Sequence, residues 1–149
     1  MKILLLSFIL IGIVSCSSDD DSSCSDSIIE TTSLENEYGC INTKYQMNIE
    51  LSDDYMIIRN QSEFSEFVTG SCQPDIDFSN YDLIIGKKGL SNGNNSINYE
   101  LIENCENGNQ NLTVTFNQNE TTEAPNLTYH ALIPKLKDGQ DLSVEINVN

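Results

Sequence analysis

The sequence is poor in basic residues: it has 7 lysines and arginines against 23 aspartates and glutamates. The formal net charge is −16 at pH 7, and it becomes −17 without residues 1–15, which hold one lysine and no acid. A surface of this sign repels phosphates, so it excludes nucleic acid and anionic lipid headgroups as partners. A cationic partner remains possible, although a charge excess usually does no more than keep a surface solvated.

Tryptophan is absent, and His130 is the only histidine. One imidazole, with no two cysteines spaced two to four residues apart, excludes the usual zinc sites. The sequence also lacks the G-x-S-x-G, P-loop, H-E-x-x-H and EF-hand motifs. We therefore expect no cofactor, no metal and no catalytic residue, and we interpret His130 as a packed or surface residue of a strand.

Long apolar segments are absent too. The run from Ile3 to Val14 follows Lys2 and is shorter than the roughly 20 residues that span a bilayer. A basic residue, a short apolar run and small residues in this order are typical of a cleaved signal peptide. Residues 1–15 are thus predicted to be a leader, and no other segment is predicted to cross a membrane.

The leader ends in Ile13-Val14-Ser15-Cys16, which resembles the lipobox of bacterial lipoproteins. The resemblance implies cleavage before Cys16, a diacylglyceryl group on its thiolate and an acyl chain on its freed amine. Each buried methylene contributes about 0.8 kcal/mol, and two chains hold a protein stably on a bilayer. We expect Cys16 to be the lipid anchor; the alternative is a plain secretory signal with a chance cysteine.

Two short patterns after Cys16 bear on location and modification. Asp19-Asp20-Asp21 resembles the signal with which one Gram-negative lineage sends lipoproteins to the outer face of its outer membrane. We therefore expect surface exposure on the outer membrane, with the periplasmic face as the alternative. Asp26-Ser27-Ile28 resembles the O-glycosylation sequon of that lineage, so Ser27 is a candidate modification site.

The other cysteines are even in number, which in an exported protein predicts disulfides. The candidates are Cys24, Cys40, Cys72 and Cys105. Three pairings are possible. We favour Cys72 with Cys105, both inside the folded region, which leaves Cys24 with Cys40. The longer loop closed in this way would stabilise the fold by about 3–4 kcal/mol.

Composition divides the chain after the leader into two parts. Residues 16–37 are predicted to be the lipidated cysteine and a flexible acidic linker, since serine, aspartate and threonine have little to bury. Residues 38–149 are predicted to be one β-rich globular domain.

Apolar residues at every second position predict most of the strands. This alternation covers 45–51, 97–101, 112–116 and 142–148. Tyr55–Ile58, a central strand at 81–85 and a strand at 129–133 complete a set of about seven. Glycine- and asparagine-rich turns at 91–95 and 106–109 suit backbone positions with positive φ.

One short helix interrupts the strands. Asn60 is the predicted N-cap with Glu63 three residues later; Phe64, Phe67 and Val68 form one apolar stripe, and Gly70 is the predicted end. The predicted fold class is therefore mainly β (α+β), an antiparallel β sandwich or open barrel with a helix on one face or end.

Asp75 and Asp77 share one side of an extended segment. A calcium contact or a carboxylate pair is conceivable there, but the remaining ligands cannot be named. We interpret the pair as part of a turn that enters the strand at 81–85.

The order of motifs over residues 57–135 resembles the PrcB C-terminal domain and related small lipoproteins. An Asn-x-x-Glu-Phe-x-x-Phe stretch is followed by Asp77-Phe78, the 83–85 strand and Ala124-Pro125, and the last matching strand ends at Pro134. The chain departs from the family at the central turn, where Gly93 stands alone instead of consecutive glycines. The resemblance implies a module that accompanies a surface protease, with no catalytic residues to carry over.

Three functions follow as hypotheses. We favour a non-catalytic protein-interaction or accessory module, bound to the lipid bilayer through acylated Cys16 and to an envelope or secreted protein such as a protease. The alternatives are a β domain that binds a small hydrophobic or glycan ligand, and a hydrolase based on cysteine or carboxylate.

Overall fold

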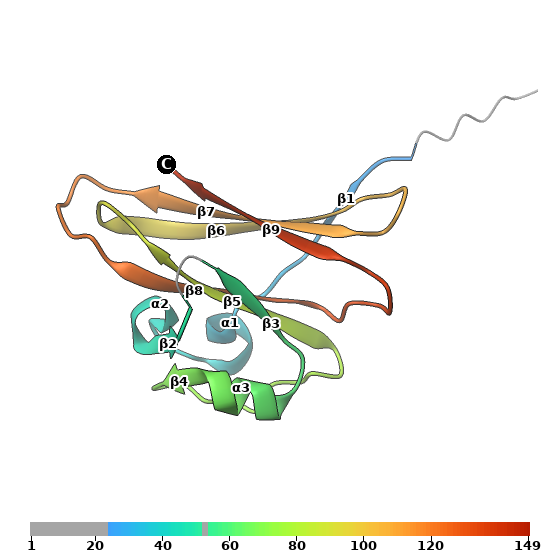
Figure 1. Ribbon diagram of the computed structural model, residues 1–149, viewed down its shortest axis with the longest axis horizontal. Helices are drawn as coiled ribbons and strands as arrows, with labels where there is room; N and C mark the ends of the chain where they lie inside the picture. Colours follow the sequence, from blue (N-terminus) through green and yellow to red (C-terminus); the bar gives the residue numbers. More distant parts are fainter. Residues whose placement is uncertain (1–23, 52–53) are drawn as a thin grey trace, which may run out of the picture.

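A computed structural model describes residues 24–51 and 54–149, which form two stacked β-sheets with short helices packed below the smaller one (Figure 1). The larger sheet has the strand order β1-β6-β7-β9 and the smaller β3-β5-β8, while β2 and β4 form a separate pair. The sandwich is open, because the sheets do not close into a barrel. The predicted mainly β, α+β class is confirmed.

The larger sheet comprises β1 (Ser27–Ile29), β6 (Asn94–Glu103), β7 (Gln110–Gln118) and β9 (Leu142–Val148). The smaller comprises β3 (Tyr55–Ile58), β5 (Tyr81–Gly89) and β8 (Asn126–Pro134). The remaining elements are α1 (Leu34–Tyr38), α2 (Thr43–Gln46), β2 (Met47–Ile49), α3 (Gln61–Phe67) and β4 (Val68–Gly70). All pairings are antiparallel except β7 with β9, so the antiparallel prediction is wrong for the last strand.

The space between the two sheets is filled by the alternating apolar residues that the sequence predicts. On β7, Leu112, Val114 and Phe116 are fully buried, and their neighbours Thr113 and Thr115 are only half-buried. The Phe116 ring meets the Tyr129 ring of β8 edge to face, with centroids 5.8 Å apart. Such edge-to-face contacts stabilise the packing of one sheet on the other beyond the burial of the rings alone.

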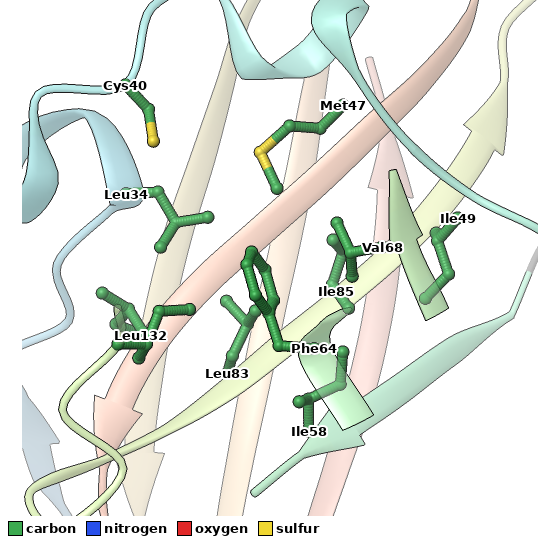
Figure 2. Close-up of a cluster of buried hydrophobic side chains, with 11 residues drawn as sticks. Leu34, Cys40, Met47, Ile49, Ile58, Phe64, Val68, Leu83, Ile85 and Leu132 are labelled. Carbon is green, nitrogen blue, oxygen red and sulfur yellow. The ribbon is translucent and has the colours of Figure 1, made fainter. Parts of the chain in front are cut away.

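A second core lies on the other face of the smaller sheet. Phe64 of α3 lies among Leu83 and Ile85 of β5 and Leu132 of β8 (Figure 2). Ile84, between the two β5 residues, packs instead into the core between the sheets. Both faces of β5 are therefore covered, which confirms the prediction that this strand is central.

Helix α3 begins as predicted and ends earlier. Asn60 Oδ1 accepts a hydrogen bond from the Glu63 backbone N–H at 2.9 Å, which satisfies one of the free donors of the first turn. Phe64 and Val68 are buried, but Phe67 is 39% exposed, so it does not belong to the apolar stripe. The helix ends at Phe67 because the chain turns into β4, and Gly70 ends that strand instead of the helix.

The predicted strand at 45–51 is shorter than expected. Residues 43–46 form α2, and only Met47–Ile49 is a strand. Met47 and Ile49 are buried as the alternation requires, whereas Tyr45 is 53% exposed.

The predicted linker is wrong over its second half. Ile28 of β1 lies opposite Ile102 of β6, Thr32 forms a β-bridge with Leu132, and α1 follows at once. Residues 27–37 therefore belong to the domain. This segment is held by pairing with strands that lie far along the chain, which local composition does not reveal.

The cysteines pair differently from our prediction: Cys24 bonds to Cys105 and Cys40 to Cys72. The register of β1 on β6 explains the first bond. Since Ser27 lies opposite Glu103 in an antiparallel pair, residue 24 reaches the level of the turn just after β6. Cys40 follows α1 and Cys72 follows β4, and these two ends lie together at the second core.

The two predicted glycine turns have different causes. Gly108 has a φ of 71°, the left-handed conformation expected of such a turn. Gly93 does not have positive φ. A Cβ there would lie 2.1 Å from Thr121 Oγ1 and 2.4 Å from Asn119 Oδ1, so a larger residue would have to displace these two side chains.

A buried carboxylate joins the end of β8 to β5. Asp82 is fully buried, with Lys135 Nζ 2.9 Å from Oδ1 and Arg59 Nε 3.8 Å from Oδ2. Oδ2 also accepts a hydrogen bond from the Leu136 backbone N–H at 3.1 Å. A buried charge needs such partners, so this cluster holds the chain after β8 in place.

Candidate functional site

The outer edge of β8 is where the fold leaves a cleft. Just before α1, Thr32 exchanges two backbone hydrogen bonds with Leu132, at 2.9 and 3.0 Å. Just after α2, the Met47 carbonyl accepts a hydrogen bond from Thr128 Oγ1 at 2.7 Å. Between these two attachments α1 and α2 pack beside β8 without filling all the space along its edge. They leave a cleft of about 370 Å³ along the β8 edge.

The lining of this cleft is mixed. Helices α1 and α2 supply hydroxyl, amide and charged side chains, β8 supplies a threonine and a histidine, and β6 supplies an apolar and an aromatic side chain. The lining residues are Ser33, Glu35, Asn36, Asn42, Thr43, Lys44, Ile97, Tyr99, Thr128 and His130.

His130 and Glu35 meet in the cleft from elements 95 positions apart in the sequence. The histidine is 5% exposed, and its Nε2 lies 3.3 Å from Glu35 Oε2. The imidazole therefore lies directly against the carboxylate. His130 is therefore packed within a strand, as predicted, but against a carboxylate that the sequence did not reveal.

Glu35 is held in its charged form. Burial by itself raises its pKa, but the contacts with His130 and Thr43 and the charge of His130 outweigh burial and lower the pKa to about 2. The Thr43 backbone N–H donates to Oε1 at 3.3 Å, and the Thr43 hydroxyl donates to the same oxygen. Glu35 thus joins α1, α2 and β8 through one carboxylate.

Tyr99 closes the back of the cleft from the opposite sheet. Its hydroxyl oxygen accepts a hydrogen bond from the His130 backbone N–H at 3.1 Å, which satisfies a donor on the outer edge of β8. Burial raises the pKa of Tyr99 far above its usual range, so the phenol stays neutral.

Local sequence explains why α1 forms where it does. Ser33 Oγ accepts a hydrogen bond from the Asn36 N–H at 3.2 Å, and Gly39 ends the helix in the left-handed conformation. Glu35 and Glu37 in the first turn favour the positive end of the helix dipole. The sequence contains these start and stop signals, but the composition of the segment, typical of a linker, led to a prediction without a helix here.

The hydroxyl groups next to His130 are already engaged. Ser33 Oγ caps α1, and the Thr43 hydroxyl donates to Glu35. Over the described ranges 24–51 and 54–149, no side-chain hydroxyl is hydrogen-bonded to the imidazole of His130. A nucleophile paired with a base is the geometry that acyl transfer needs. Polar side chains of α1, α2 and β8 line the cleft.

Asp77 has the structural role that the sequence indicates. Its carboxylate accepts hydrogen bonds from the Ser79 N–H at 3.1 Å and from Asn80 Nδ2 at 2.7 Å, in the turn that leads into β5. The Asn80 contact is the main reason that its pKa is lowered. Asp75 lies on the surface beside it. In the part of the chain that the structure describes, no three histidine, cysteine, aspartate or glutamate side chains group as metal ligands.

The remaining predicted sites lie at the start of the chain. Cys16 falls outside the described residues. Ser27 is exposed on β1, opposite Glu103. Its neighbour Asp26 accepts hydrogen bonds from the Cys105 N–H at 3.0 Å and from Asn104 Nδ2 at 3.3 Å, which fixes the start of β1 beside the turn after β6.

Comparison with known proteins identifies no relative. No family model, no curated protein and no solved structure matches this chain. Of the helices in residues 24–51 and 54–149, none has the length and apolar character needed to cross a membrane.

Proposed function

We propose that this chain is a lipoprotein anchored by acylated Cys16, displayed on the outer surface of an outer membrane, and acting as a non-catalytic protein-interaction module. The observation that carries the anchor is the pairing of the cysteines. Cys24 with Cys105 and Cys40 with Cys72 engage the four cysteines after Cys16, which leaves the thiol of Cys16 for lipid. Two disulfides also suit the oxidising environment of an exported protein.

The placement of Cys24 supports a domain carried close to its anchor. Only eight positions separate Cys16 from Cys24, where the first disulfide ties the chain to the end of the larger sheet. At about 3.5 Å per residue, this segment spans at most about 28 Å. The domain would therefore stay near the bilayer, a distance suited to contacts with other envelope proteins.

The described surface supports the interaction role. Ile41 is 75% exposed and Tyr45 is 53% exposed, and both flank the part of α2 that lines the cleft. Exposed apolar groups beside polar ones are typical of binding surfaces. The resemblance to the PrcB C-terminal domain suggests a protease or another envelope protein as the partner.

Fractionation and protease shaving of intact cells test this proposal together. The full chain should sediment with membranes and lose its domain to external protease. A Cys16→Ser variant should leave the membrane fraction while its domain remains folded, and a Ser17→Ala variant should behave like the wild type. Membrane retention of Cys16→Ser would contradict the anchor, and protection of the wild-type chain from external protease would place it on the periplasmic face.

The cleft favours a second candidate, a β domain that binds a small ligand such as a glycan. Its volume of about 370 Å³ lies within the range of small-molecule sites, and amide and hydroxyl groups line it together with Ile97 and Tyr99. Saccharide titration of the wild type and of an Ile97→Trp variant would test this role, since a bulkier side chain should fill the cleft and abolish binding. A hydrolase has less support, because the cleft hydroxyls are engaged elsewhere.

A further inference from the structure

The outer edge of β9 is open along its whole length, because no described strand or helix covers it. Residues 94–100 of β6 also lack a partner on the side of β1, but that stretch has an irregularity between Asn94 and Ser96. β9 is the last strand of the larger sheet and has seven residues, whereas β1 and β3, at two other sheet edges, have three and four. The outer edge of β8 is occupied by Thr32 and Tyr99. Natural edges are usually blunted by lysine, proline or a bulge. β9 has neither residue, and its pairing with β7 has no register shift.

The ladder with β7 determines which backbone groups of β9 are free for pairing. At one end the Gln110 N–H donates to the Asp141 carbonyl, and at the other the Asn149 N–H donates to the Phe116 carbonyl, both at 2.9 Å. In a parallel ladder every second residue bonds to the same neighbour. The odd-numbered residues of β9 therefore use their backbone groups on β7, while Val144 and Ile146 direct theirs at the open edge.

The side chains of β9 describe the strand that would fit there. Leu142, Val144 and Ile146 pack against the core between the sheets but stay only half-buried. An added strand would cover them further if its inward side chains were apolar. On the outer face Glu145 is exposed, in a row with Thr113 of β7 and Glu100 of β6. A lysine or arginine on the added strand would lie beside this carboxylate.

Charge argues against a second copy of the chain as the occupant. Two copies would each bring a net charge of −16 to the contact. An antiparallel β9–β9 pair centred on Glu145 would also place this carboxylate directly opposite itself, which is destabilising. An extended segment with cationic side chains has the opposite charge and needs no symmetry.

We propose that β9 is the docking edge of the interaction module, and that it receives from the partner protein an extended segment in which apolar and basic side chains alternate. The segment adds a fifth strand to the larger sheet. Backbone hydrogen bonds to Val144 and Ile146 provide affinity, and Glu145 selects a basic residue. This inference rests on the proposed interaction role and gives it a surface and a partner chemistry.

The test uses the full chain and a capped peptide in which valine alternates with lysine, with a valine–glutamate peptide as its control. Hydrogen exchange followed by NMR should slow at the Val144 and Ile146 amides when the lysine peptide is added, and not with the glutamate peptide. Glu145→Lys should weaken binding at least about threefold. Ile146→Pro should weaken it about tenfold, because proline removes the outward N–H, whereas Ile146→Ala keeps the N–H and should bind nearly as well as wild type.

Equal binding of both peptides, exchange that slows at β3 instead of β9, or self-association of the chain through β9 would each overturn the proposal. The surface variant Glu145→Lys keeps it testable if Ile146→Pro fails to fold. Lipidation does not enter this experiment. If the lysine peptide does not bind, the docking edge is refuted and the lipid anchor is unaffected. If the Cys16→Ser variant stays with membranes, the anchor is refuted and the docking edge is unaffected.

Discussion

Replacing Glu35 by glutamine tests whether one carboxylate holds α1 and α2 against β8. The change keeps the size of the side chain and removes the charge that faces His130 at 3.3 Å. The pKa of Glu35 is lowered from 4.5 to about 2, which would correspond to about 3 kcal/mol of stability without solvent screening. The side chain is 34% exposed, so solvent screening reduces the expected loss to about 1–2 kcal/mol at neutral pH.

The sign of the pH dependence follows from the direction of the shift. A carboxyl whose pKa is lower in the folded state stabilises the fold fully above its unfolded value of 4.5 and loses that contribution as the pH falls toward about 2. The wild type and Glu35→Gln should therefore differ most at neutral pH and converge near pH 2.

Urea unfolding followed by circular dichroism at several pH values measures this difference. Glu37→Gln is the matched control, because Glu37 lies exposed in the same helical turn. A Glu35→Gln loss that does not change with pH, or one no larger than that of Glu37→Gln, would refute the role we assign to this carboxylate.

Three further predictions concern stability, each read from the midpoint of urea unfolding. The Cys24–Cys105 disulfide closes a loop of 81 residues, and its removal should cost about 4.5 kcal/mol of stability. The Cys40–Cys72 disulfide closes 32 residues, and its removal should cost about 3.7 kcal/mol. The reverse order of the two losses would contradict the loop-entropy account. Phe64→Ala should cost about 3–5 kcal/mol, because it empties the centre of the second core, and a loss below about 1 kcal/mol would show that the core is not packed around it. Asp82→Asn should cost about 2 kcal/mol through its contacts with Lys135 and the Leu136 N–H, and an unchanged midpoint would show that the buried charge is not needed.

The strands were predictable where the chain itself carries the alternation. Leu112, Val114 and Phe116 are buried at every second position, and Leu83-Ile84-Ile85 is apolar on both faces because both faces are covered. The helix at Asn60 was predictable for the same reason, since its cap and buried face lie within a few residues.

The candidate site was not predictable, because its parts meet only through long-range pairing. His130 was named from the sequence, but its partner Glu35 lies in a segment with the composition of a linker. The predicted disulfide pairing was wrong for a related reason. Cys72 and Cys105 were paired because both lie in the predicted folded region, which left Cys24 for Cys40, whereas the antiparallel register of β1 on β6 brings Cys24 to Cys105.

Mass spectrometry of the protein purified from membranes, after digestion without reduction, tests the central claim most directly. The account predicts a chain that begins at Cys16 and carries acyl chains on that residue, with the four other cysteines linked as Cys24–Cys105 and Cys40–Cys72. A retained leader, an unmodified thiol at Cys16, or a disulfide from Cys16 to any other cysteine would contradict it.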